Sequence, residues 1–316
     1  MMNCLVTGAA GFIGSRLCRR LLRQKGFSVT GVDCFTDYYP RFIKEKNLQP
    51  LLQLSRFHFI EKDINHLDLP ALLKKVDVVF HLAAQAGVRS SWGRKFSDYT
   101  WNNIESTQKI LEACSADPVK KLVYASSSSV YGDCPDLPMR ETSPLFPCSP
   151  YGVTKLAGEH LCSLYSRNYG IPAVSLRFFT VYGPGQRPDM AFHKFFKSAN
   201  ENKPVSVYGS GEQTRDFTYI DDIVEASLAA MDKGKPGEVY NIGGGHNRKI
   251  KDIFPLLNEV TGRKIEINHI KKQKGDVAHT SADISKAKTD LGYNPQTPLA
   301  EGLREEWIWV RHLYSY

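Results

Sequence analysis

The first 33 residues contain a strand, a glycine-rich loop, a helix and a second strand, and this order restricts the fold more than any other feature of the chain. An apolar run at residues 4–7 leads into the loop, a helical pattern of leucines follows, and a strand at 28–33 ends in Asp33. Glycines in such a unit let the backbone approach a pyrophosphate at the helix N-terminus, and the acidic residue hydrogen-bonds an adenosine ribose. The loop glycines are Gly8, Gly11 and Gly14. We therefore expect a dinucleotide site, and Asp33 favours NAD over NADP because its charge would repel a 2′-phosphate.

Strands and helices continue to alternate beyond this unit. The expected strands are apolar along nearly their whole length, which is typical of parallel strands buried on both faces. They lie at residues 57–61, 76–82, 121–126 and 173–178, with helices at 99–114 and from Pro150 to about residue 170. The sequence thus predicts an α/β fold, a doubly wound parallel sheet (Rossmann) with a smaller C-terminal α/β substrate domain.

The pattern loosens after residue 180 into short segments rich in glycine, proline and charge. We therefore expect residues 1–180 to form the dinucleotide-binding domain and residues 181–316 to form the smaller domain. Two later segments still resemble core elements, so the chain is expected to re-enter the first domain at about 217–244.

A tyrosine and a lysine follow a strong helix start at Ser149 and Pro150. Tyr151 and Lys155 are four residues apart, so both side chains lie on one face of this helix. A free phenol has a pKa of about 10. A nearby ammonium and a cationic nicotinamide would both favour the phenolate and lower the pKa of the phenol, which would make it a base. The pair alone is a common coincidence, and its meaning depends on the dinucleotide site.

Serine side chains follow the strand at 121–126. In a doubly wound sheet, ligands lie beyond the carboxyl ends of the strands, so Ser127, Ser128 and Ser129 are expected to face the same crevice as Tyr151. A hydroxyl there is a credible hydrogen-bonding partner for the reacting group.

Composition excludes several other classes of function. The net charge is +8, but the basic residues are scattered apart from a short lysine cluster around Lys272, so we expect no nucleic-acid partner. The seven cysteines are an odd number and form no Cys-x-x-Cys pair, which argues against a zinc site or a disulfide framework and suits the cytoplasm. No apolar run reaches the length of about 18 residues that a membrane span needs, so we expect no membrane partner.

Taken together, the motifs resemble those of the extended short-chain dehydrogenase/reductase family, and within it the NAD-dependent nucleotide-sugar epimerases. The motifs are the three spaced glycines, Asp33, the pair 63–64, HLAA at 81–84, SSSSVYG at 126–132, YGVTK at 151–155 and RFFTVYGP at 177–184. This resemblance implies a Rossmann domain, tightly bound NAD, a C-terminal nucleotide-sugar domain and a homodimer.

Further segments are similar to those of UDP-glucuronic acid 4-epimerases. They lie at residues 37–39, 86–89, 187–192 and 275–277. Thr180 stands where epimerases of neutral UDP-hexoses usually carry asparagine. The resemblance therefore implies interconversion of UDP-glucuronic and UDP-galacturonic acids through a 4-keto sugar, with hydroxyls and the guanidinium of Arg187 suited to a uronic carboxylate.

The resemblance also implies a set of site residues and no metal. The catalytic residues would be Ser127, Tyr151 and Lys155. The NAD site would consist of Gly8, Gly11, Phe12, Ile13, Gly14, Asp33, Asp63, Ile64, Leu82, Ala83, Ala84, Asn103 and Lys155. The UDP-sugar site would consist of Arg89, Ser128, Ser129, Thr180, Arg187, Ala191, Phe192, Arg215 and Asp276. His81, by contrast, is expected to be structural.

Other functions remain open at this stage. A UDP-glucose or UDP-N-acetylglucosamine 4-epimerase is opposed by Thr180 and Arg187, and a UDP-glucuronate decarboxylase is opposed by Ser129, where its relatives carry glutamate. A non-catalytic NAD-sensing protein need not keep Tyr151, Lys155 and Ser127.

Overall fold

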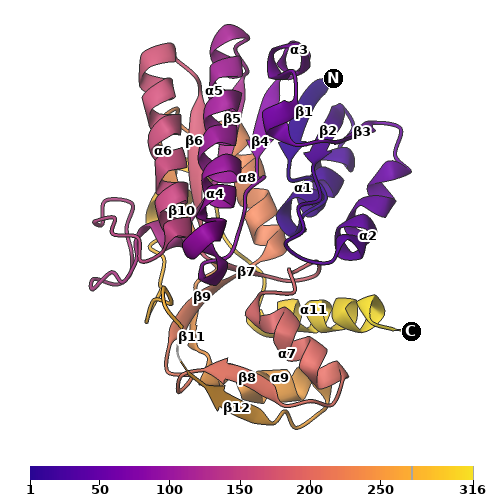
Figure 1. Ribbon diagram of the computed structural model, residues 1–316, viewed down its shortest axis with the longest axis vertical. Helices are drawn as coiled ribbons and strands as arrows, with labels where there is room; N and C mark the ends of the chain where they lie inside the picture. Colours follow the sequence, from indigo (N-terminus) through magenta and orange to yellow (C-terminus); the bar gives the residue numbers. More distant parts are fainter. Residues whose placement is uncertain (272, 316) are drawn as a thin grey trace.

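Seven parallel strands form the central sheet of the protein, in the order β10-β6-β5-β4-β1-β2-β3 (Figure 1). The computed structural model describes residues 1–271 and 273–315, so Lys272 of the lysine cluster lies outside the described residues. The order of the strands reverses between β1 and β4, and such a sheet binds its ligands at the carboxyl ends of the strands beside this point. The strands are β1 (Met2–Thr7), β2 (Phe27–Asp33), β3 (Phe57–Glu61), β4 (Val78–His81), β5 (Lys121–Ser127), β6 (Ala173–Phe178) and β10 (Val239–Ile242).

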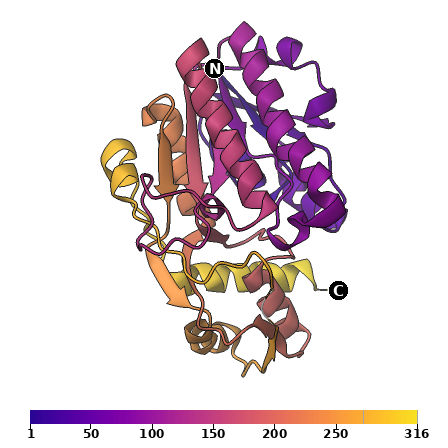
Figure 2. The same ribbon diagram turned by 60° about the vertical axis from the view of Figure 1, so that its left-hand side comes forward.

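Side chains alternate along the strands between two separate cores, one on each face of the sheet. Val6 of β1 packs in the first core, and its neighbour Leu5 packs in the second. The helices of the first face are α1 (Phe12–Leu22), α2 (Arg41–Leu52), α8 (Ile220–Lys233) and α10 (Ser285–Leu291). Those of the second face, in front in Figure 2, are α3 (Leu69–Leu73), α5 (Ser106–Ala116) and α6 (Pro150–Tyr169). No helix in the described ranges is long and apolar enough to cross a membrane.

A smaller α/β region lies below the carboxyl ends of the central strands (Figure 1). Its three-stranded sheet contains β7 (Thr180–Tyr182), β9 (Thr214–Tyr219) and β11 (His246–Lys249), and its two-stranded sheet contains β8 (Val205–Tyr208) and β12 (Ile267–Ile270). Its helices are α7 (Ala191–Asn200), α9 (Phe254–Thr261) and α11 (Leu299–Leu313). Between β9 and β11 the chain returns to the large sheet, because β10 pairs with β6 and α8 packs on α1. The predicted fold class is confirmed.

Local signals define α6, the helix that carries the tyrosine and the lysine. The hydroxyl of Ser149 accepts a hydrogen bond from the backbone N–H of Gly152 at 3.1 Å, and Pro150 occupies the first helical position. Gly170 ends the helix with a φ of +69°, a left-handed conformation that favours glycine. These are the start and the end that the sequence predicts.

The helix expected at residues 99–114 is divided in the structure. A short helix, α4 (Phe96–Tyr99), is followed by a π-helical turn at Thr100–Glu105 before α5 begins. Wider turns of this kind occur often at functional sites. Here the turn contains Asn103, whose buried amide bonds three partners outside the helix, and no hydrophobic periodicity announces such a turn.

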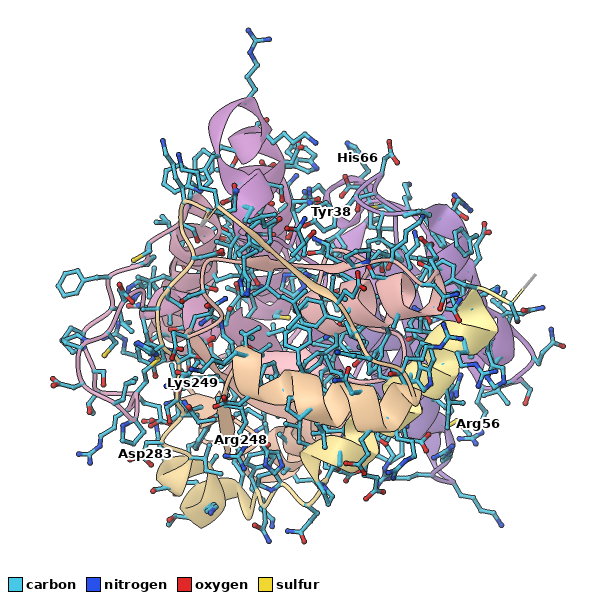
Figure 3. All side chains as sticks on the ribbon, turned by 90° about the horizontal axis from the view of Figure 1, so that it is seen from below. Tyr38, Arg56, His66, Arg248, Lys249 and Asp283 are labelled. Atoms are coloured by element: carbon cyan, nitrogen blue, oxygen red, sulfur yellow. The ribbon has the colours of Figure 1, made fainter. Side chains whose placement is uncertain are left out.

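Basic side chains are distributed over the surface in ion pairs and carbonyl contacts. Figure 3 labels Arg56 on one side of the molecule and Arg248 and Lys249 on the other. Arg56 donates to the carbonyls of Gln24 and Phe27, and Lys249 pairs with a glutamate at 2.9 Å. All seven cysteines are free thiols. Within residues 1–271 and 273–315, no three His, Cys, Asp or Glu side chains gather as metal ligands would.

Candidate active site

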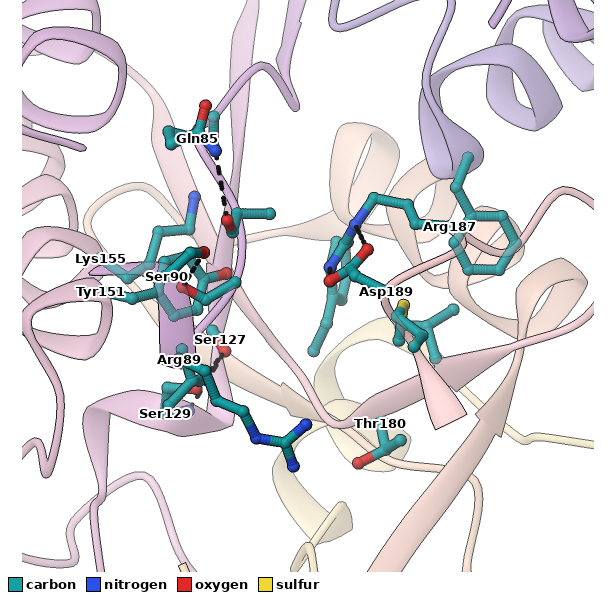
Figure 4. Close-up of a pocket in the computed structure, with 18 of the residues that line it drawn as sticks. Gln85, Arg89, Ser90, Ser127, Ser129, Tyr151, Lys155, Thr180, Arg187 and Asp189 are labelled. Carbon is teal, nitrogen blue, oxygen red and sulfur yellow. Dashed lines mark hydrogen bonds and ion pairs between the residues drawn. The ribbon is translucent and has the colours of Figure 1, made fainter. Parts of the chain in front are cut away.

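A cavity of about 810 Å³ lies between the carboxyl ends of the central strands and the smaller region. The glycine loop, the ends of β4 and β5 and the start of α6 line its upper part, and β8 and β9 line its lower part. Figure 4 shows Tyr151, Lys155, Ser127 and Ser129 on one side of it, with Arg187 opposite.

The glycine loop is shaped for a group that approaches the backbone closely. Gly8 has a φ of +72°, and a Cβ added there would lie 2.9 Å from the backbone nitrogen of Ala83. A Cβ on Gly14 would lie 2.1 Å from the carbonyl oxygen of Gly8. No side chain caps α1, whose first residues, Phe12 and Ile13, line the cavity. Its unpaired backbone N–H groups and the helix dipole suit a pyrophosphate.

Two acidic residues line the far end of the cavity from Tyr151. Asp33 accepts hydrogen bonds from the backbone of Ala10 at 3.2 Å and of Phe35 at 2.9 Å, and it pairs with Lys44 at 3.1 Å. Asp63 accepts a hydrogen bond from the indole N–H of Trp101 at 2.9 Å, and Ile64 beside it also lines the cavity. These groups suit a ribose and an adenine edge.

A threonine and a histidine support the part of the cavity wall that follows β4. Thr7 Oγ1 accepts from the backbone N–H of Leu82 and of Ala83, which line the cavity with Ala84. Thr7 also bonds His81 Nδ1 at 2.8 Å. Burial and the charge of Lys155 lower the pKa of His81 to about 3, so His81 is a neutral structural group.

Asn103 lies behind the cavity wall. Its Oδ1 accepts from the backbone of Gln85 at 2.7 Å, and its Nδ2 donates to the carbonyl of Gln85 at 3.0 Å and to Thr154 Oγ1 at 2.9 Å. Asn103 therefore ties the segment after β4 to α6, and Gln85 takes the place on the wall that the sequence assigns to Asn103.

The three residues expected to be catalytic lie together in the cavity (Figure 4). Ser127 ends β5, and its Oγ accepts from the backbone N–H of Ser129 at 3.2 Å. Its hydroxyl donates to Ser129 Oγ at 3.1 Å, and the ring of Tyr99 packs edge-on against Tyr151 at 6.3 Å. Lys155 lies one turn further along α6.

Burial dominates the titration of the tyrosine and the lysine. Burial raises the pKa of Tyr151, and the charge of Arg187 and the polar side chain of Ser127 oppose this effect. Burial lowers the pKa of Lys155 to about 8. The Lys155 ammonium lies 4.8 Å from the ring centroid of Tyr124. Arg187 thus favours the phenolate within the protein, and the same role of Lys155 stays a prediction of the sequence.

Thr180 and Arg187 come from the smaller region and line the wall opposite Tyr151 (Figure 4). Thr180 begins β7. Arg187 forms a two-point ion pair with Asp189, with Nε 2.9 Å from Oδ1 and Nη2 3.0 Å from Oδ2. Ser128 and Ser129 face the same space from the end of β5.

Two further arginines line the cavity beside β8 and β9. Arg89 pairs with Asp276 at 2.8 Å and stacks 3.9 Å from the ring centroid of Tyr208. Arg215 donates to the carbonyls of Thr214 and Val277 at 2.7 and 2.9 Å. Such a cluster of guanidinium groups suits a diphosphate.

Phe192 is the second predicted site residue whose side chain lies away from the cavity. Its ring packs 4.8 Å from that of Phe217 in the aromatic core, whereas the adjacent Ala191 lines the cavity. Only the backbone of Phe192 remains available for a ligand.

Several cavity residues carry no role in the sequence prediction. Lys44, Tyr38 and Asp189 all line the cavity and hydrogen-bond predicted site residues or one another. Tyr38 and Asp189 lie in segments that resemble the uronic-acid epimerases, which was the available signal for them. Lys44 has no such signal, because only the packing of α2 on α1 and β3 brings it to Asp33.

A glycine cradle at a helix N-terminus, beside a serine, a tyrosine and a lysine at the carboxyl end of a parallel sheet, defines the short-chain dehydrogenase/reductase class. The chain belongs to the NAD dependent epimerase/dehydratase family, whose model matches residues 4–243. The predicted family is thereby confirmed.

Individual relatives extend over nearly the whole chain. A crystal structure of the UDP-glucuronic acid 4-epimerase of Bacillus cereus, in complex with UDP-glucuronic acid and NAD, has a TM-score of 0.96 and 49% identity, and the match covers 99% of this chain and 100% of that one. The UDP-glucuronate 4-epimerase of Thermodesulfobacterium geofontis is 40% identical over 97% of this chain and 95% of its own. A Bacillus subtilis protein described as an uncharacterized UDP-glucose epimerase, YtcB, is 49% identical over 99% of both chains.

Proposed function

We propose that this protein is an NAD-dependent UDP-sugar 4-epimerase that interconverts UDP-glucuronic acid and UDP-galacturonic acid through a 4-keto sugar. The observation that carries the proposal is the placement of Tyr151 and Ser127 opposite Thr180 and Arg187 in one cavity. The first pair suits a sugar hydroxyl that must lose its proton, and the second suits a carboxylate on the same sugar.

The residues of the upper cavity fit NAD. The glycine cradle and the N-terminus of α1 would hold the pyrophosphate, Asp33 the adenosine ribose and Lys155 the nicotinamide ribose. When bound, NAD⁺ supplies a reversible hydride acceptor for sugar C4, so the reaction has no net redox change. In domain terms, we propose that residues 1–180 with about 217–244 hold the cofactor and that residues 181–316 hold the nucleotide sugar.

Tyr151 is the base in this mechanism. Its phenolate takes the proton of the sugar 4-hydroxyl, and Ser127 shares the hydrogen bond with the same oxygen. Because burial raises the pKa of Tyr151, the phenolate needs neighbouring positive charge, which Arg187 supplies in part. When the 4-keto sugar is reduced on its other face, the Tyr151 phenol returns the proton.

Epimerisation requires that the keto sugar turn while the nucleotide stays bound. Arg89 and Arg215 would bind the diphosphate, with Asp276 and the backbone near Ala191 on the uridine. Rotation about the link between sugar and diphosphate then presents the opposite face of C4.

Hydroxyls and a guanidinium on the opposite wall would hold the uronic carboxylate. A 4-keto uronic acid is a β-keto acid, and cleavage of its C5–C6 bond releases CO₂ and leaves an enolate that takes up a proton. Ser128, Ser129, Thr180 and Arg187 hold the carboxylate in an orientation that disfavours this cleavage. No carboxylate stands at Ser128 or Ser129, so the acid–base group of the dehydratases and decarboxylases resembling this chain is missing.

We also propose that the protein acts in the cytoplasm as a homodimer. Its seven free thiols suit a reducing compartment. Val153 and Leu164 of α6 are 49% and 48% exposed, and their spacing of eleven residues puts both on one face of the helix. A second copy that packs on this face would bury them.

Substrate trials test the proposal. The protein is incubated with UDP-glucuronic acid or UDP-glucose without added NAD, and the products are followed by proton NMR. Galacturonate signals are expected. Galactose signals from UDP-glucose alone would select the neutral hexose epimerase, pentose would select the decarboxylase, and no turnover would select a non-catalytic protein.

A further inference from the structure

Arg187 already meets a carboxylate of the protein on the wall opposite Tyr151. Its Nε and Nη2 donate to the two carboxylate oxygens of Asp189 at 2.9 and 3.0 Å. These two nitrogens form one edge of the guanidinium group, so Asp189 fixes both its plane and its direction. Among the described residues, Nη1 has no hydrogen-bond partner. The end of the group formed by Nη1 and the second N–H of Nη2 is therefore left for another planar carboxylate.

Tyr38 holds Asp189 by a direct hydrogen bond. The Tyr38 hydroxyl donates to Asp189 Oδ2 at 3.1 Å, although the two residues belong to different parts of the fold. The Tyr38 hydroxyl fits in this position only because residue 87 is a glycine. A Cβ on Gly87 would lie 2.0 Å from the hydroxyl, and Gly87 has a φ of +103°. Ser90 also donates to Tyr38 at 3.4 Å.

Further contacts connect Tyr38 through Ser90 to Tyr151. Ser90 shares a 2.7 Å hydrogen bond with the hydroxyl of Tyr99, and the ring of Tyr99 packs edge-on against Tyr151. The orientation of Arg187 is thus set by a continuous network that ends at the reacting group. Figure 4 shows Arg187 paired with Asp189 on one side of the cavity and Tyr151 on the other.

A carboxylate beside Arg187 can act in two opposite ways. Asp189 could repel a uronic carboxylate and compete with it for the guanidinium, or it could orient the guanidinium for the substrate. The contacts favour the second, because both oxygens of Asp189 are already occupied by three donors. Asp189 also binds the edge of Arg187 formed by Nε and Nη2, whereas the end formed by Nη1 and Nη2 is left for the substrate.

We propose that Asp189, held by Tyr38, is a positioning residue that aims the free end of Arg187 at the uronic carboxylate. Retention of the carboxylate and preference for a uronic sugar then depend on both residues. This inference rests on the proposed function.

Binding measurements on the NAD-loaded full-length protein separate positioning from general stability. Affinities for UDP-glucuronic acid and for UDP, which lacks the hexuronic acid, are measured by calorimetry for the parent, Asp189→Asn and Tyr38→Phe. Asp221→Asn is the matched control, because Asp221 forms a two-point pair with Arg16 away from this cavity. A general loss of structure weakens both ligands, whereas a lost orientation weakens UDP-glucuronic acid alone.

We expect the preference for UDP-glucuronic acid over UDP to fall about tenfold in Asp189→Asn and about threefold in Tyr38→Phe, the range for a charged and a neutral hydrogen bond. The fraction of UDP-pentose among the products should rise in the same order. An unchanged preference and pentose fraction in both variants, or tighter binding of UDP-glucuronic acid by Asp189→Asn, would overturn the inference. If the parent itself neither prefers nor epimerises UDP-glucuronic acid, the proposed function fails first.

Discussion

The ammonium of Lys44 lies 3.1 Å from Oδ1 of Asp33, and the two side chains are only 9% and 7% exposed. The aromatic rings of Tyr39 and Phe35 surround the ammonium at 5.3 and 5.8 Å. Asp33, the group expected to select NAD, is therefore compensated by a cation that comes from α2. The selectivity of the site depends on the pair rather than on the carboxylate alone.

This pair makes a prediction about cofactor choice. Asp33→Ser removes the repulsion of a 2′-phosphate and leaves Lys44 to bind it, so the variant should retain NADP as well as NAD. Lys44→Met leaves a buried carboxylate unpaired and should destabilise the protein by about 3–5 kcal/mol while weakening NAD binding. The full-length variants are equilibrated with equal amounts of NAD⁺ and NADP⁺, and the retained dinucleotides are released and quantified. Lys46→Met on the same helix is the control, and retention of NAD alone by Asp33→Ser contradicts the prediction.

Tyr151→Phe should slow epimerisation strongly without loss of the fold. General acid–base groups contribute roughly 10²–10⁴-fold to rates, so turnover should fall by about that factor. Binding of UDP-glucuronic acid should change little, because the lost hydroxyl acts on the reacting proton. Initial rates by proton NMR and affinities by calorimetry give the two readouts. Turnover equal to that of the parent would exclude Tyr151 as the base.

The helix α6 is predictable from the sequence alone. Ser149, Pro150 and Gly170 act on the backbone within a few residues of their own positions, so they define this helix before any tertiary contact is known. The glycine loop is local in part, because Gly14 lies against the backbone of Gly8, whereas Gly8 itself lies against Ala83 after β4. Fold class, dinucleotide groove and catalytic helix are therefore predictable from short patterns.

The parts that the sequence misses depend on contacts between distant segments. Tyr38 and Asp189 are 151 positions apart, and Arg89 and Asp276 are 187 apart, so each pair exists only once the smaller region packs below the sheet. Asn103 lies behind the wall because a π-helical turn rotates it toward α6, and no local pattern encodes that turn.

Loss of the carboxylate contacts should turn part of the reaction toward decarboxylation. In Thr180→Ala and Arg187→Ala, the 4-keto uronic acid is held less firmly, so the fraction of UDP-pentose should rise above that of the parent. The double variant Tyr151→Phe/Arg187→Ala is the control and should release far less, because the 4-keto sugar forms roughly 10²–10⁴-fold more slowly without the Tyr151 hydroxyl. Proton NMR resolves the products. A pentose fraction no higher than that of the parent would refute the proposed role of these two residues.

The exposed apolar residues of α6 predict the oligomeric state. Leu164→Glu places a charge on the face that we propose to be buried in a homodimer, and the measured mass should fall from that of two chains to that of one. Ile308→Glu on α11 is the matched control, since Ile308 is 43% exposed on another surface. Light scattering after gel filtration measures both. A parent that elutes as a single chain would contradict the dimer.

His81 predicts a specific dependence of stability on pH. Thr107 Oγ1 donates its proton to the carbonyl of Asn103, so it can only accept from His81 Nε2, and the other ring nitrogen then accepts from the hydroxyl of Thr7. Burial, with the charge of Lys155, lowers the pKa of His81 to about 3. The ordinary pKa of about 6.5 returns on unfolding. The stability that neutral His81 contributes above pH 6.5 is therefore lost as the pH falls toward 3, because only the unfolded chain takes up the proton.

At pH 5 this loss amounts to about 2 kcal/mol, from 1.5 pH units at about 1.4 kcal/mol each. His81→Gln cannot take up that proton, so the difference in unfolding free energy between parent and variant should shrink by about 2 kcal/mol from pH 7 to pH 5. Urea unfolding at fixed NAD concentration, followed by tryptophan fluorescence, measures it, with the exposed His58→Gln as the control. A difference that stays constant over this range would mean that the folded protein protonates His81 as readily as the unfolded chain does.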